Sequence, residues 1–273
     1  MITSAHPGAV GSLRRIMDAY LDSVLTRNPT RSALGPQCRV TVNAVLAGPE
    51  ETPPIDDFPA LQIFSDPAQG GVVVAGAARV AGALSPYALR LRVENEHIVE
   101  VEMLLSRTSH GHFADVDQLL SPDVLYDAPV PARRASDREG LKAAADSYWT
   151  ALQESDGSLA KFAYRCDRFD NGKKITNNLS ILASPEAAVL TCVSGLYATR
   201  PARPVARNRR FPVLDVSLGV AVSFVLVDFN PNALIKLPGM THYMLGLFKI
   251  VDGEIRSLDE ITEKLPFGAP AVW

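Results

Sequence analysis

The feature that most constrains the fold is an internal repeat. Apolar residues recur at helical spacing along one face of residues 13–24, and the same pattern returns in residues 141–152. Five identities keep a constant offset of 128 residues without a gap: Leu13 and Leu141, Asp18 and Asp146, Tyr20 and Tyr148, Cys38 and Cys166, and Asn43 and Asn171. Such a repeat predicts two copies of one unit that runs from a helix to a strand.

Both copies also end alike. YALRLRVENEHIVEVEMLL and HYMLGLFKIVDGEIRSLDEI each read as two alternating strands joined by a tight polar turn, Asn95-Glu96 in the first and Asp252-Gly253 in the second. The second copy carries an insertion before its last hairpin. We therefore predict three parts: an N-terminal half over residues 1–108, a linker over 109–135 and a C-terminal half over 136–273.

The second copy contains further predicted elements. Ser184-Pro185-Glu186 is an N-cap followed by Pro at the first helical position, which predicts a helix over 185–198. Alternating apolar residues predict four strands, over 205–215, 219–229, 242–251 and 254–263. We expect an α+β fold in which each half is a cone, with helices packed on a curved antiparallel sheet and a pocket at the open end.

Composition argues against several classes of function. Lys and Arg number 27 against 30 Asp and Glu, so the sequence predicts no nucleic-acid partner. No apolar run approaches the roughly eighteen residues of a membrane span, and the first residues lack the basic start of a signal peptide, so we expect no membrane partner and a cytoplasmic protein. The three cysteines lack metal-ligand spacing and are expected to be free. His110 and His112 stand alone in the predicted linker, so neither a metal nor another cofactor is predicted.

Two tandem cones resemble the nuclear-transport-factor-2-like superfamily, which includes ketosteroid isomerase, scytalone dehydratase and polyketide cyclases. The segments CDRFDNGKKITNN, ARNRRFPVLDVSLGVAVSFVLVDF and LFKIVDGEIRSLDEI, with the ending LPFGAPAVW, are similar to a two-copy family of uncharacterised fungal and bacterial proteins. The resemblance implies a small aromatic substrate, no cofactor and a homodimer or higher homo-oligomer. Size and general build also resemble the diarylpropane lyases, which convert a 1,2-diarylpropane-1,3-diol into a stilbene, formaldehyde and water.

The second copy supplies polar groups where the first does not. Val40 and Val42 become Arg168 and Asp170, so one strand face changes from apolar to charged. If this face points into the cone, the two charges form a buried pair at the pocket. The alternatives are that the face turns outward or lies between the halves. We expect Arg168 and Asp170 to be catalytic.

Two other candidates have counterparts in the first copy. Asn171 matches Asn43, which favours a shared structural role such as an Asx-turn, although we also consider it for substrate binding. Tyr148 matches Tyr20, which favours core packing with a polar tip. The alternative is that the Tyr148 hydroxyl donates into the pocket.

Further candidates lie in the last strands. Alternation along ARNRRFPVLD puts Arg207 and Arg209 on one face and Arg210 on the other, and Arg210 with Asp215 is the preferred pair to stabilise an anionic intermediate. His242 can exchange a proton near neutral pH, although a histidine at a strand start is often a surface residue. The remaining residues considered for substrate binding are Asn177 and Tyr243.

These residues together predict a cofactor-independent carbon–carbon lyase. A cation favours the phenolate of the substrate, His242 helps the benzylic hydroxyl to leave as water, and Asp170 takes a proton as formaldehyde departs. One alternative is a dehydratase, isomerase or cyclase with a polyketide or steroid-like substrate. The other is a non-catalytic module for ligand binding or dimerisation.

Overall fold

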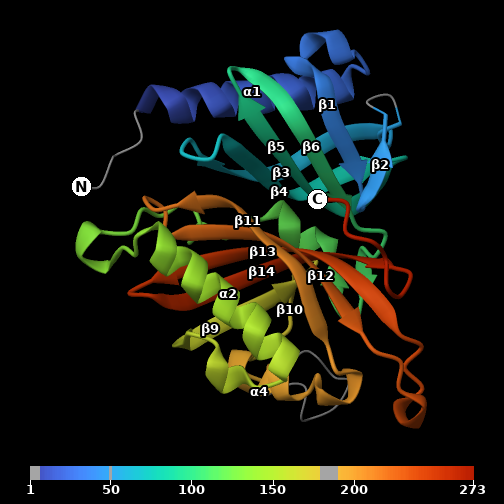
Figure 1. Ribbon diagram of the computed structural model, residues 1–273, viewed down its shortest axis with the longest axis vertical. Helices are drawn as coiled ribbons and strands as arrows, with labels where there is room; N and C mark the ends of the chain where they lie inside the picture. Colours follow the sequence, from blue (N-terminus) through green and yellow to red (C-terminus); the bar gives the residue numbers. More distant parts are fainter. Residues whose placement is uncertain (1–6, 49–50, 179–189) are drawn as a thin grey trace.

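The chain folds into two halves that are stacked on each other (Figure 1). The computed structural model describes residues 7–48, 51–178 and 190–273. Each half consists of a six-stranded sheet with helices packed against it, and a two-stranded hairpin lies in the connection between the halves. The predicted α+β class with two tandem helix-and-sheet halves is therefore confirmed.

The N-terminal half begins with helix α1 (Pro7–Leu25), which buries Leu13, Met17 and Tyr20 against the sheet. The sheet order is β2-β1-β6-β5-β4-β3. The strands are β1 (Leu34–Val42), β2 (Val45–Ala47), β3 (Ile55–Asp66), β4 (Gly71–Val80), β5 (Ala83–Glu94) and β6 (His97–Leu105), and a short 3-10 turn, η1 (Pro29–Arg31), precedes them.

The C-terminal half repeats this plan. Helix α2 (Arg138–Glu154) begins at Asp137, whose carboxylate accepts a hydrogen bond from the Gly140 amide, and it ends at Ser155 in the left-handed conformation. The sheet order is β10-β9-β14-β13-β12-β11. The elements are β9 (Phe162–Asp170), β10 (Lys173–Lys174), α4 (Cys192–Tyr197), β11 (Val205–Asp215), β12 (Val220–Phe229), β13 (Met240–Val251) and β14 (Glu254–Leu265).

The four predicted strands of the second copy match β11 to β14 closely, but the prediction of purely antiparallel sheets is wrong for one pair of strands in each half. Strand β1 runs parallel to β6, and β9 runs parallel to β14. The strands of each pair are separated along the chain by the whole meander, so no tight turn joins them. Without a tight turn, the two strands can run parallel. The predicted helix over 185–198 starts at Cys192 in the structure, and residues 185–189 lie outside the described residues.

Helix α2 packs on one face of the C-terminal sheet. Trp149 is fully buried there, and its indole nitrogen donates a 3.1 Å hydrogen bond to the Ser223 hydroxyl. A Cβ at Gly246 would lie 2.9 Å from the Trp149 ring, so this position of β13 has no room for a side chain. The missing side chain thus lets the helix approach the sheet.

The opposite faces of the two sheets pack against each other. Phe64 and Val73 of the N-terminal half contact an apolar cluster that includes Phe224 and Leu245 of the C-terminal half. Tyr126 of the connecting segment is buried in the same cluster, and its hydroxyl donates to the Leu247 carbonyl oxygen at 3.1 Å. That segment contains β7 (His110–Gly111), β8 (Ala114–Asp115) and the 3-10 turns η2 (Val116–Leu120) and η3 (Ala132–Arg134).

Two expectations from composition can be compared with the structure. Cys38, Cys166 and Cys192 are all free thiols, as predicted, and the last two are buried. Across the described parts of the chain, no helix is both long and apolar enough to cross a membrane.

Candidate active site

A polar cluster lies between helix α2 and the sheet of the C-terminal half. The parallel register of β9 and β14 places Asp170 opposite Glu260 and Arg168 opposite Leu258. Tyr148 of α2 donates a 2.8 Å hydrogen bond to Glu260 Oε1, and Arg168 Nε lies 3.7 Å from Glu260 Oε2. We call Tyr148, Arg168, Asp170 and Glu260 the polar cluster. The face that carries Arg168 and Asp170 therefore lies toward helix α2, on the inner side of the cone, which is one of the alternatives that the sequence left open.

Burial changes the protonation of this cluster. The Glu260 side chain is only 2% exposed, and burial together with the neighbouring Asp170 carboxyl raises the pKa of Glu260 well above its ordinary range. Glu260 therefore holds a proton at neutral pH. A neutral Glu260 reduces the number of charges that this part of the fold has to bury. Two carboxyls in contact provide an acid and a base at one place.

Two atoms of the cluster are buried without a hydrogen-bond partner among the described residues, Arg168 Nε and Asp170 Oδ1. A buried polar atom without a partner costs about 1–3 kcal/mol. The oxygen atoms and hydroxyls of a bound small molecule could supply both missing partners, a hydrogen-bond acceptor for Arg168 and a donor for Asp170. These two atoms are therefore the points at which a ligand would gain most.

The N-terminal half has no such cluster at the equivalent place. In the parallel pair of β1 and β6, Val42 lies opposite Met103 and Val40 lies opposite Val101. A cavity of about 420 Å³ opens in this half beside Tyr20 and Val40, and none of its lining residues is a carboxylic acid. The same fold thus forms a cavity in this half without an acid or a base.

Asn171 has the structural role that its match with Asn43 favours. Its main-chain N–H donates to the Glu260 carbonyl oxygen at 2.8 Å, and its side-chain Oδ1 accepts from the main-chain N–H of Thr262 at 2.9 Å. Asn43 makes the same two bonds with the last strand of its own half, at 2.9 and 2.8 Å. Both asparagines also adopt the left-handed conformation, with φ of 44° and 50°. The side chain of Asn171 is therefore engaged with the main chain and is not directed at a ligand.

Asn177 and the two buried thiols lie beside the polar cluster. The Asn177 amide group donates to Asp167 Oδ1 at 3.3 Å, which holds the segment after β10 against β9. The Cys166 and Cys192 thiols are hydrogen-bonded to each other. This contact and burial raise the pKa of Cys166, whereas the same contact lowers the pKa of Cys192. Sequence patterns had not indicated this proximity.

Arg210 and Tyr243 lie on the other face of the sheet, between the halves, which corrects their expected place in the pocket. Arg210 Nη1 is 2.9 Å from Glu102 Oε2, and the Tyr243 hydroxyl donates to the same carboxylate. The pairing of β11 with β12 shifts between Arg207 and Arg210, where Asn208 has a φ of 53°. A bulge of this kind breaks simple alternation.

Arg209, rather than Arg210, faces helix α2. Its guanidinium donates to the Thr150 hydroxyl at 2.9 Å and to Asp146 at 3.3 Å. Asp215, the expected partner of Arg210, instead closes the turn after β11, where its Oδ1 accepts from the Ser217 hydroxyl and the Leu218 amide. Asp215 therefore lies apart from both arginines.

His242 lies on the same sheet face as the polar cluster but away from it. It pairs with Lys264 across β13 and β14, whereas Glu260 pairs with Gly246, so four residues, or roughly 13 Å, separate the two levels. Its ring centroid lies 4.7 Å from that of Phe229, and burial lowers the pKa of His242 to about 4. The imidazole is therefore neutral at pH 7 and has no imidazolium proton to donate.

Glu260 is the main residue that the sequence prediction missed. Aligning the last hairpins on their turns, Asn95-Glu96 and Asp252-Gly253, puts Glu260 at the position of Met103. This change from apolar to acidic is the same signal that pointed to Arg168 and Asp170. It lies beyond the insertion, where the constant offset of the first part of the repeat no longer holds.

One further group of possible ligands lies on the connecting segment. Single ligand atoms of His110, Asp115 and Asp117 lie within 4.8 Å of one another. His110 and Asp117 are exposed and contact each other at 3.2 Å, which accounts for their proximity without an ion. We assign no metal site to them.

Comparisons with known proteins indicate no activity. The family model described as domain of unknown function DUF8021 matches residues 134–262, and no curated protein matches the chain. Twelve chains of solved structures are similar, and three of them are as follows. A nuclear-transport-factor-2-like protein of unknown function from Cytophaga hutchinsonii is 10% identical, with a TM-score of 0.30 over 39% of this chain and 95% of that chain. A de novo designed protein with a curved β-sheet is 12% identical, with a TM-score of 0.28 over 36% and 87%. A Xanthomonas campestris protein, named as a calcium/calmodulin-dependent protein kinase II association domain, is 14% identical, with a TM-score of 0.30 over 49% and 91%.

Proposed function

We propose that the C-terminal half is a cofactor-independent acid–base enzyme that acts on a small hydroxylated aromatic molecule. The observation that carries this proposal is the pair of carboxyls formed by the buried Glu260 and the half-buried Asp170, opposite each other on β9 and β14. Because burial keeps a proton on Glu260 and a second carboxyl lies beside it, the pair can donate and accept a proton in one reaction. Arg168 supplies a positive charge beside them.

The proposed reaction converts a 1,2-diarylpropane-1,3-diol into a stilbene, formaldehyde and water. Arg168 stabilises the substrate phenolate, and Glu260 gives its proton to the benzylic hydroxyl, which leaves as water to form a quinone methide. The Asp170 carboxylate then takes the proton of the terminal hydroxymethyl group. The carbon–carbon bond breaks, its electron pair restores the aromatic ring, and formaldehyde departs.

The carboxyl pair also closes the catalytic cycle. Glu260 loses one proton and Asp170 gains one, so a transfer between the two contacting carboxyls restores the starting state. Tyr148 positions Glu260 through its 2.8 Å hydrogen bond. Glu260 thus takes the role of acid that His242 was expected to have, since His242 carries no charge at neutral pH.

The test is to incubate the purified full chain with a phenolic 1,2-diarylpropane-1,3-diol and to follow stilbene absorbance and formaldehyde. We expect Asp170→Asn and Glu260→Gln each to lower kcat by about 10²- to 10⁴-fold while substrate binding changes little. Asp215→Asn is the matched control, because this carboxylate only closes a turn, and its kcat should equal that of the wild type.

Two outcomes would contradict the proposal. A folded protein that binds the diol without turnover, and whose Asp170 and Glu260 variants lose affinity by degrees, would be a binding module. Turnover that is insensitive to both variants would place the chemistry elsewhere. Turnover of a polyketide or steroid-like substrate in place of the diol would leave the acid–base pair in place and change the reaction to that of an isomerase, dehydratase or cyclase.

A further inference from the structure

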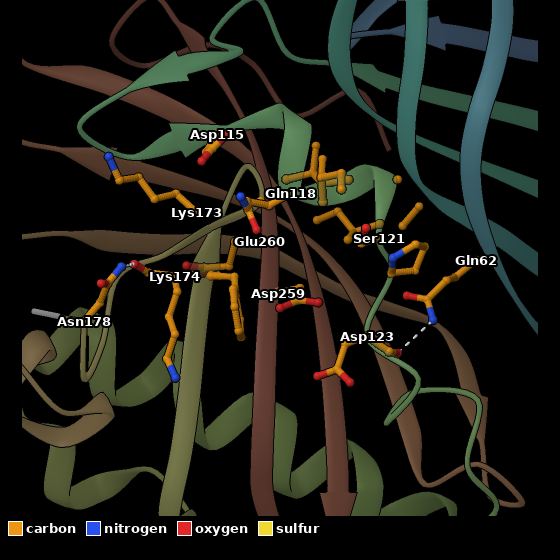
Figure 2. Close-up of a pocket in the computed structure, with 18 residues that line it drawn as sticks. Gln62, Asp115, Gln118, Ser121, Asp123, Lys173, Lys174, Asn178, Asp259 and Glu260 are labelled. Carbon is orange, nitrogen blue, oxygen red and sulfur yellow. Dashed lines mark hydrogen bonds between the residues drawn. The ribbon is translucent and has the colours of Figure 1, made fainter. Parts of the chain in front are cut away.

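A second cavity, of about 340 Å³, lies where the two halves and the connecting segment meet (Figure 2). Its floor is the face of the C-terminal sheet that lies opposite to helix α2 and toward the N-terminal half. Its walls come from the N-terminal half and from the connecting segment. The residues on which the following steps depend are Phe169, Leu245, Asp259 and Ile261 of the floor, and Gln62 and Asp123 of the walls. Asp259 and Glu260 are neighbours on β14, so their side chains point to opposite faces of the sheet.

Asp259 is a carboxyl without a cation. Its Oδ1 is buried and has no hydrogen-bond partner among the described residues, and no lysine or arginine in the described ranges forms an ion pair with Asp259 or with Asp123. Burial and the nearby Asp123 carboxylate raise the pKa of Asp259 to about 8. Two carboxyls therefore face one cavity with no positive partner from the surrounding chain.

The N-terminal half shows what this position needs. Aligned on the hairpin turns, Asp259 corresponds to Glu102, which is fully buried and contacts Arg90 at 3.1 Å and Arg210 at 2.9 Å. Arg90 is the cross-strand neighbour of Glu102. The cross-strand neighbour of Asp259 is Leu247. The cation that neutralises the first carboxylate is thus replaced by an apolar residue beside the second.

The other charged groups around the cavity have partners of their own. Lys173 donates to the Gly111 carbonyl oxygen at 2.9 Å, and Lys174 pairs with Asp167 at 2.9 Å. Lys249, the buried cation on the same sheet face, donates to two main-chain carbonyl oxygens. Asp115 adds a further acidic group to the lining, whereas the Glu260 side chain points to the opposite face of the sheet. None of these cations is therefore paired with Asp259, which leaves that carboxyl for a positive ligand.

We propose that this cavity binds a small organic cation, with an amidinium or guanidinium group on Asp259 and an apolar body on Phe169, Leu245 and Ile261. A planar cation of this type can make two parallel hydrogen bonds with a carboxylate, as arginine does. It would neutralise Asp259 as Arg90 neutralises Glu102. The volume of the cavity lies within the range of small-molecule sites.

The test uses benzamidine as the cation and benzamide as its neutral counterpart of nearly the same shape. Calorimetric titration of the full chain should show at least tenfold tighter binding of benzamidine. Asp259→Asn should weaken benzamidine binding at least tenfold, whereas Asp57→Asn, an exposed carboxylate of the N-terminal half, should leave it unchanged. Titrations at pH 7 in two buffers should reveal the release of close to one proton, because Asp259 must ionise to bind the cation.

A second variant keeps the proposal testable if Asp259→Asn does not fold. Leu247→Arg restores the arrangement of the N-terminal half and should block benzamidine by pairing with Asp259. Equal affinity for benzamidine and benzamide, no binding of either, or binding that survives both variants would overturn the proposal. This site is independent of the proposed lyase reaction, so the failure of one does not affect the other.

Discussion

The two halves share one backbone plan and differ in what lies between helix and sheet. Asn43 and Asn171 make the same main-chain bonds at the same place, so the scaffold is maintained in both. One residue further back, Val42 faces Met103 in the first half, whereas Asp170 faces Glu260 in the second. The fold therefore does not require the charges, and a few side-chain changes on an unchanged frame are sufficient to build an acid–base cluster.

The largest predicted effect on stability comes from removing one residue of the polar cluster while the others remain. Arg168→Val leaves the buried Glu260 and the half-buried Asp170 carboxyls without their cation and should lower the free energy of unfolding by about 3–5 kcal/mol. The triple exchange Arg168→Val, Asp170→Val and Glu260→Met copies the apolar set of the N-terminal half and should be close to neutral, because buried ion pairs can be replaced by apolar residues. Urea unfolding measures both. A single variant that costs less than about 1 kcal/mol would show that the cluster is solvated.

The next effect concerns the carboxyls between the halves. The unfolded chain releases the Asp259 proton near pH 3.8, whereas the folded protein keeps it to about pH 8. The free energy of unfolding should therefore fall as the pH rises through this interval, by at most about 1.4 kcal/mol per pH unit. Asp259→Asn should make the profile less steep between pH 5 and pH 8, where the buried Glu260 still contributes in the same direction. A wild-type profile that is already flat there would contradict the raised pKa.

Several features of the fold follow from the sequence because they depend on local patterns. Helical spacing after Leu13 and Leu141 and alternation in the last hairpins depend on residues close together in the chain. The contrast between Val40 and Arg168 indicated the charged face, because the repeat is continuous over that stretch. These signals do not depend on how distant elements pack.

The rest depends on packing that no local pattern encodes. Arg210 was assigned to the pocket, but its position follows from a bulge at Asn208 and from Glu102 of the other half. His242 has an ordinary place in the sequence, and only burial against Phe229 shows that its pKa is low. Glu260 lies beyond the insertion, so the constant offset did not reach it. The sequence misplaced residues such as Arg210, whose contacts come from the other half of the molecule and whose orientation follows from a strand bulge.

The two asparagines should have equal effects. Asn43→Gly and Asn171→Gly keep a residue that tolerates the left-handed conformation and remove the side-chain bonds to the last strand of each half. Asn171→Gly also removes two 3.3 Å bonds, to Ser106 and Thr108. Each should lower the free energy of unfolding by about 1–3 kcal/mol, since main-chain groups are left without partners. Chemical denaturation compares the two. A cost confined to Asn171 would indicate that it belongs to the active site and not to the shared scaffold.

The smallest effect separates the two tyrosines. Tyr148→Phe removes the hydrogen bond to Glu260 and should lower the free energy of unfolding by about 1 kcal/mol. Tyr20→Phe should change it by less than about 0.5 kcal/mol. The reason is that Val42 and Met103 take the places of Asp170 and Glu260 in the first half and offer no carboxylate. Thermal unfolding of both variants gives the comparison. In the proposed reaction, Tyr148→Phe also lowers kcat more than it changes KM, because a less well positioned acid affects the chemical step and not substrate binding. Equal stability costs in the two halves, with kcat unchanged, would mean that Tyr148 only fills the core, as Tyr20 does.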